Sequence, residues 1–113
     1  MANLGVVSTV TVFFKEVPMK FKIEAVIKGK LDSDRKIVAG IDAIEFRKAL
    51  DEIVRLMEYK GIGKSLREED IDFYGMESIA TFIIKKLTNK FPVSHVRVWE
   101  GEDEYAIVHA DEV

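Results

Sequence analysis

The feature that most constrains the fold is a change of periodicity along the chain, which alternates near both ends and turns helical between them. Val7–Phe14 (VSTVTVFF) and Lys20–Gly29 alternate early, and Val93–Glu100 and Glu104–His109 alternate late. Runs rich in β-branched and aromatic residues with a period of two predict strands. Gly101 in the short GED connection supplies the backbone freedom of a tight turn, so the last two runs predict a hairpin.

The second run shows how such a strand is expected to lie. One face would be apolar and the other charged, with Val26 as the exception; the apolar set is Phe21, Ile23, Ala25 and Ile27, and the charged set is Lys20, Lys22, Glu24 and Lys28. This pattern predicts an antiparallel sheet with one face in water. Pro18 is expected in the connection between the first two strands, where no ladder hydrogen bond is needed.

The middle of the chain predicts two helices. Asp42 followed by Glu45 has the spacing of a capping box, and this helix should end before Gly61. Its apolar residues recur at helical intervals: Ala43, Phe46, Leu50, Ile53, Val54 and Met57. A polar stretch from Lys60 to Asp72 follows. A second helix should begin near Gly75, bury Met76, Ile79, Ala80, Ile83 and Leu87, and stop before Pro92.

The resulting order, β-β-α-α-β-β, predicts an α+β fold in which an antiparallel four-stranded sheet carries two helices on one face. The chain has 113 residues, of which 48% are hydrophobic, so we expect a single domain over residues 1–113.

Composition excludes several classes of function. The net charge of −3 and the absence of a basic face argue against a nucleic-acid partner. The absence of cysteine excludes disulfides, cysteine–zinc sites and a thiol nucleophile. No stretch is long and apolar enough to span a bilayer, so no membrane association and a cytoplasmic location are expected. Charged residues make up 33% of the chain, a proportion that favours a thermophilic source.

Several stretches carry a resemblance to a known family. The closing hairpin of the 6-pyruvoyl-tetrahydropterin synthase family is similar to VRVWE (Val96–Glu100) with EYA (Glu104–Ala106), and the start of its second helix is similar to MESIA (Met76–Ala80). The end of its second strand resembles GKLD (Gly29–Asp32), and its first helix with the lead-in resembles KIVAGIDAIEFRKALDEI (Lys36–Ile53). That family includes the 6-carboxytetrahydropterin synthases. The resemblance implies the ββααββ tunnelling fold, whose subunits close their sheets into a ring, so a homo-oligomer is expected.

The resemblance also implies a ligand site. The family's glutamate that matches Glu100 anchors a pterin, and one ionised carboxylate can accept both the exocyclic amine and the adjacent ring N–H of a pterin or purine. Glu100 shares a strand face with Val96 and Val98, where a flat heterocycle could dock. Backbone amides near Gly75 and Met76, at a helix N-terminus, could bind the ring oxygen.

The family's metal chemistry is not matched. Its three zinc histidines include a His-Gly-His pair that falls on Val17 and Met19, and neither His95 nor His109 lies near these positions. Valine and methionine cannot replace imidazole for zinc, so no metal and no cofactor are expected. The family's activity is that of a carbon–oxygen lyase of pterin biosynthesis. The family's nucleophile and its Asp-His couple are also missing from this sequence. Glu58 and Tyr59 remain as candidates for proton transfer, and whether the protein is catalytic stays open.

Two alternatives to a metal-free pterin or purine binder remain open. A dihydroneopterin aldolase-like enzyme would need no metal; Glu77 would then be the anchor, with Tyr59, Tyr74 and a lysine as candidate proton carriers. A paralogue without catalytic activity, which only assembles with other subunits, is the third reading.

Overall fold

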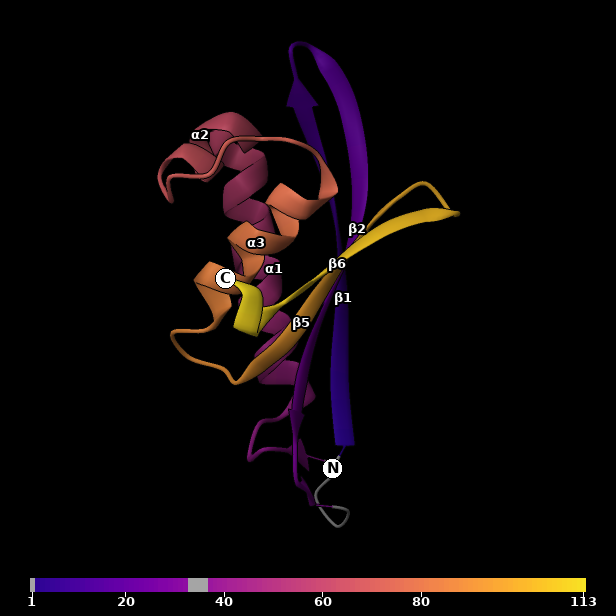
Figure 1. Cartoon of the computed structure of the whole chain (residues 1–113), viewed down its shortest axis with the longest axis vertical. Helices are drawn as coiled ribbons and strands as arrows, with labels where there is room; N and C mark the ends of the chain where they lie inside the picture. Colours follow the sequence, from indigo (N-terminus) through magenta and orange to yellow (C-terminus); the bar gives the residue numbers. More distant parts are fainter. Residues whose placement is uncertain (1, 33–36) are drawn as a thin grey trace.

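A long antiparallel sheet forms one layer of the molecule. The computed structural model describes residues 2–32 and 37–113. The sheet contains β1 (Ala2–Phe14), β2 (Val17–Gly29), β5 (Val93–Glu100) and β6 (Glu104–His109) in the order β1-β2-β5-β6, and every neighbouring pair is antiparallel. The first two strands extend far beyond the helical layer at one end, and β5 and β6 cross them obliquely (Figure 1).

The alternation of the sequence sets which face of the sheet is buried. In β1, Val6, Ser8, Val10 and Val12 are buried and the intervening residues are exposed, and in β2 the predicted set from Phe21 to Ile27 is fully buried. The expected sheet is therefore confirmed. The first two strands are longer than predicted, because the turn at Lys15–Glu16, with φ of 50° and 67°, needs only two residues.

Pro18 lies inside the β1–β2 ladder rather than in the connection, so that prediction is wrong. It pairs with Phe13, and β5 pairs with β2 only from Phe21 onward, so no strand lies beside Pro18 on its other edge. Thr9 and Thr11 direct their backbone groups away from β2, and Phe13 continues that alternation. Phe13 and Pro18 are therefore a pair that exchanges no backbone hydrogen bonds, so the N–H that proline lacks is not needed in the ladder.

Three helices cover one face of the sheet: α1 (Ala43–Lys60), α2 (Ile62–Arg67) and α3 (Met76–Leu87) (Figure 1). Asp42 caps α1, with its Oδ1 accepting from the Ile44 N–H at 2.7 Å. Gly61, with φ of 88°, ends α1 as predicted and also begins α2. The polar stretch predicted after α1 thus contains an additional short helix, which buries Ile62 and Leu66.

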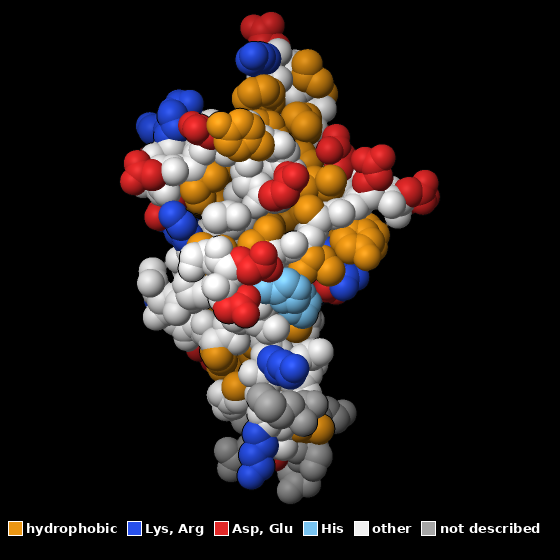
Figure 2. Space-filling view, in the orientation of Figure 1, with side chains coloured by type: hydrophobic (Ala, Val, Ile, Leu, Met, Phe, Trp, Pro, Cys, Tyr) orange, Lys and Arg blue, Asp and Glu red, His pale blue; other side chains and the backbone are white. Residues whose placement is uncertain are grey.

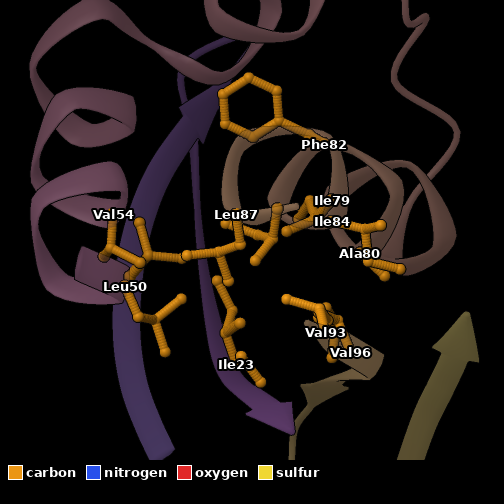
Figure 3. Close-up of a cluster of buried hydrophobic side chains, with 14 of the residues drawn as sticks. Ile23, Leu50, Val54, Ile79, Ala80, Phe82, Ile84, Leu87, Val93 and Val96 are labelled. Carbon is orange, nitrogen blue, oxygen red and sulfur yellow. The ribbon is translucent and has the colours of Figure 1, made fainter. Parts of the chain in front are cut away.

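The core lies between this helical layer and the sheet. Phe46 of α1 is fully buried and meets Phe91, with 5.1 Å between the ring centroids. Figure 3 shows hydrophobic side chains of both layers converging; the labelled residues are Ile23, Leu50, Val54, Ile79, Ala80, Phe82, Ile84, Leu87, Val93 and Val96. Most of the predicted helix faces are confirmed as core, whereas Ile53 and Met76 are only partly buried and Ala43 lies outside the core cluster.

Two small elements complete the chain. β3 (Leu31–Asp32) pairs with β4 (Ile37–Val38) between β2 and α1, and a single turn of 3₁₀ helix, η1 (Ala110–Glu112), follows β6. The family-like segment Lys36–Ile53 begins at a residue outside the described ones. Within residues 2–32 and 37–113, no helix is both long and apolar enough to cross a membrane.

Candidate functional site

Glu100 ends β5 at the boundary of the helical layer. It lies between Phe21 of β2 and Glu104 of β6 in the sheet register. Val96 and Val98, on the same strand face, are fully buried, whereas Glu100 is exposed. The strand therefore continues past the helices and places this carboxylate where the apolar face emerges into solvent.

The surroundings of Glu100 are strongly acidic. Glu102, Asp103 and Glu104 follow it in the same projecting hairpin, and all are exposed. Acidic side chains gather at this projection in the space-filling view (Figure 2). Such a field attracts N–H donors and cations and repels phosphate, so the hairpin suits the donor edge of a heterocycle better than an anionic group.

The N-terminus of α3 presents the other predicted ligand-binding residues. Gly75 is the N-cap with φ of 114° and makes no side-chain cap, while the Ser78 hydroxyl accepts from the Tyr74 N–H at 2.7 Å. Met76 is partly buried against the core, and Glu77 is exposed in the first turn. The glycine is needed because a side chain at this φ would be strained.

A single copy of the chain does not enclose Glu100. Its side chain is exposed, and five hollows in the described part of the chain are lined by other residues, with Gly75, Met76 and Glu77 also absent from them. A hollow of about 400 Å³ lies close by, but it is lined by Lys22, Trp99 and Glu102 among others and not by the anchor candidate. A slot for a fused ring at Glu100 would therefore need walls from a second copy.

Glu58 and Tyr59 lie elsewhere. Glu58 Oε2 accepts from the backbone N–H of Thr11 at 3.0 Å, and Oε1 is ion-paired with Arg55. Glu58 is thus engaged at the outer edge of β1, and β2 separates β1 from the strand of Glu100. Tyr59 is 88% exposed. The structure does not bring either residue to Glu100.

The positions expected from the sequence to match the family's zinc pair, Val17 and Met19, lie near the β1–β2 turn. Val17 is exposed and Met19 is partly buried, opposite Phe14 and Val12. Neither side chain offers an imidazole or a carboxylate, so these residues do not fit a zinc triad. Among the residues that the structure describes, no group of three or more His, Cys, Asp or Glu could hold a metal ion.

His95 and His109 face each other across β5 and β6, with 5.5 Å between their ring centroids. They lie on the face of the sheet opposite the helices, since Val96 is buried on the other side. The Ser94 hydroxyl contacts His95 Nδ1 at 3.1 Å. Burial, and then the neighbouring His109, lowers the pKa of His95 below its usual 6.5.

A cluster of cations and aromatic rings on this open face was not predicted from the sequence. Lys22 Nζ lies 4.5 Å from the ring centroid of Trp99, and Arg97 lies 4.9 Å from that of Tyr105. Trp99 and Tyr105 pack with centroids 4.5 Å apart. In the sequence these residues occupy alternate positions of three separate strands. Only the strand register shows that the cations and rings lie side by side.

The fold is that of an α+β protein whose open antiparallel sheet carries its helices on one face, and its candidate site is a carboxylate at the end of the third strand of that sheet. The model of one family, 6-pyruvoyl tetrahydropterin synthase, matches residues 19–111. The chain belongs to that family, which confirms the resemblance inferred from the sequence. Comparison with curated proteins gave no match.

Proposed function

We propose that this chain is a metal-free member of the 6-pyruvoyl tetrahydropterin synthase family that binds a pterin or related purine through Glu100 at a subunit interface. The observation that carries the proposal is the position of Glu100, exposed at the end of an otherwise buried strand face in a protein of this family. One carboxylate there offers two acceptor oxygens to the paired donors of a pterin edge.

Assembly follows from the same arrangement. The sheet ends in two edge strands, β1 and β6, and pairing them between copies would remove both exposed edges. A homo-oligomer, with a ring as its closed form, would also supply the missing walls around Glu100. The α3 N-terminus, with Gly75 and Met76, offers backbone N–H groups for the ring oxygen.

The direct test is a thermal-shift titration with pterin and neopterin. A ligand present at 100 times its Kd stabilises a protein by about 2.7 kcal/mol, which raises the Tm of a domain of this size by about 10 °C. Glu100→Ala and Glu100→Gln should abolish the shift, because the first removes the acceptors and the second replaces one with a donor. Glu102→Ala is the matched control, since it removes a neighbouring charge from the same turn.

Three outcomes would contradict the proposal. No shift at saturating ligand would favour the assembly paralogue. Loss of the shift in Glu77→Ala but not in Glu100→Ala, together with glycolaldehyde and hydroxymethyldihydropterin formed from dihydroneopterin, would favour the aldolase-like enzyme. Stoichiometric zinc in the purified protein, measured by elemental analysis, would refute the metal-free state.

A further inference from the structure

A small hollow lies among the three helices, with an apolar floor and a charged mouth. Its volume is about 90 Å³, which is about three times the share of one water molecule in the liquid. Residues of α1 and α3 form its walls, and α2 and the turn after it complete the lining. The lining residues are Ile53, Leu56, Met57, Lys60, Ser65, Glu68, Phe82 and Lys86. The residues proposed to bind the pterin are not among them.

The floor of the hollow is apolar because α1 and α3 turn core residues toward each other there. Met57 is fully buried, and Phe82 is 4% exposed. Figure 3 shows the Phe82 ring projecting from α3 toward α1. The buried Ser65 hydroxyl already donates to the Gly61 carbonyl oxygen at 2.8 Å. A thioether beside an aromatic ring favours contact with a second aromatic ring.

Two ion pairs stand at the mouth. Lys60 Nζ of α1 lies 3.0 Å from Glu68 Oε2, and Lys86 Nζ of α3 lies 2.8 Å from Glu69 Oε1. The Lys86 ammonium also lies 5.8 Å from the centroid of the Phe82 ring. The four charged side chains are 31–41% exposed, so each pair adds little to stability and can open for a ligand at small cost.

The charges at the mouth favour an anion. The hydrogen bond from Lys60 lowers the pKa of the Glu68 carboxyl, and the charges of Lys64 and Lys86 act in the same direction. Three ammonium groups therefore act on one carboxylate. A second carboxylate that entered the mouth would meet the same cations, whereas a cationic group would be repelled by them.

We propose that this hollow binds a small aromatic carboxylate, with its ring against Met57 and Phe82 and its carboxylate on the ammonium groups of Lys60 and Lys86. The inference goes beyond the proposed function and does not depend on it, because the two sites share no residue. The volume suits a single ring rather than a fused pair, so a pterin is not the expected occupant. A ligand of this size at a partly open mouth should bind in the millimolar range.

Methionine methyl resonances provide a local readout. Among the methionines that the structure describes, Met57 alone lines the hollow, whereas Met19 lies in β2 and Met76 begins α3. In methyl-labelled full-length protein at pH 7, sodium benzoate should shift the Met57 signal saturably through its ring current and leave Met19 and Met76 unchanged. Acetate should give no saturable shift, and benzyl alcohol, which keeps the ring but lacks the charge, should bind about fivefold more weakly.

Substitutions at the mouth give opposite expectations. Lys60→Met keeps the apolar stem and removes the charge, so benzoate should bind about fivefold more weakly. Glu68→Gln removes the carboxylate that competes for Lys60, so benzoate should bind about two- to fivefold more tightly. Tighter binding would not result from a change that only loosened the helices. Lys48→Met is the matched control, because Lys48 is exposed on α1 and does not line the hollow.

The outcomes separate this site from the pterin site. A Met57 signal that stays in place at tens of millimolar benzoate overturns the inference, and so does a parallel drift of all the methionine signals. Equal affinity for benzoate and benzyl alcohol, or unchanged affinity in both Lys60→Met and Glu68→Gln, overturns the assignment of an anionic ligand. The thermal shift with pterin depends on Glu100 and is read independently of Met57, so either proposal can fail without the other.

Discussion

Gly29, the last residue of β2, is packed so closely that a methyl group should destabilise the fold. A Cβ added there would lie 2.5 Å from the Cβ of Ala39 and 3.1 Å from its Cα. Ala39 cannot easily retreat, because its N–H donates to the Lys30 carbonyl at 3.0 Å. Gly29→Ala therefore forces a backbone shift at the junction between β2 and the segment that leads into α1.

Two opposing effects set the magnitude. The substitution should gain about 0.4–1 kcal/mol from the smaller entropy of the unfolded chain. Overpacking of this kind costs about 1–3 kcal/mol, and the 2.5 Å approach belongs at the upper end of that range. We expect a net loss of about 1–2 kcal/mol in the free energy of unfolding, which lowers the Tm by about 4–8 °C.

Ala39→Gly provides the matched rescue. It removes the atom that the new methyl group would meet, and it relieves a φ of 53° that alanine adopts with strain. Urea unfolding followed by circular dichroism should show Gly29→Ala/Ala39→Gly within about 0.5 kcal/mol of Ala39→Gly, with a coupling energy of about 1 kcal/mol or more. Equal losses for Gly29→Ala with and without Ala39→Gly would refute the steric reasoning.

Three further predictions follow from single contacts. Phe46→Ala should cost about 3–5 kcal/mol of stability by urea unfolding, because the ring is fully buried against Phe91; a loss below about 1 kcal/mol would contradict that packing. Asp42→Ala should cost about 1 kcal/mol by removing the cap of α1, and Asp42→Asn should retain most of it. Because the pKa of His95 is lowered in the folded state, the unfolded state binds more protons as the pH drops from 6.5, so the free energy of unfolding should fall. The urea midpoint should depend less steeply on pH in His95→Gln, and an equal dependence in both proteins would count against this.

Most of the fold could be predicted because the periodicity of the apolar residues and the positions of proline and glycine indicate the same element boundaries. The closing strands were placed at Val93–Glu100 and Glu104–His109, as observed, since Pro92 and Gly101 mark their limits. The additional helix α2 was missed because it has only 6 residues, too few for a helical period to emerge, with Gly61 just before it and Gly63 inside it.

The candidate site was less accessible from the sequence. Glu100 could be selected from its strand parity and from the family resemblance, and the structure places it at the edge of the apolar face. The role of Glu58 depends on a contact with Thr11, which lies 47 positions earlier, and no local pattern reports such a distance. The same applies to the rings and cations on the open face, which the strand register alone brings together.

The packing around Trp99 gives the protein a built-in optical reporter. It is the only tryptophan in the chain, and it lies between the ammonium of Lys22 and the ring of Tyr105. Its emission therefore reflects the polarity and charge of one surface, with no background from other indoles. Because Tyr105 belongs to the strand proposed to join the next subunit, dilution of the oligomer should change both the emission wavelength and the energy transfer from tyrosine, so that subunit exchange can be followed without a label.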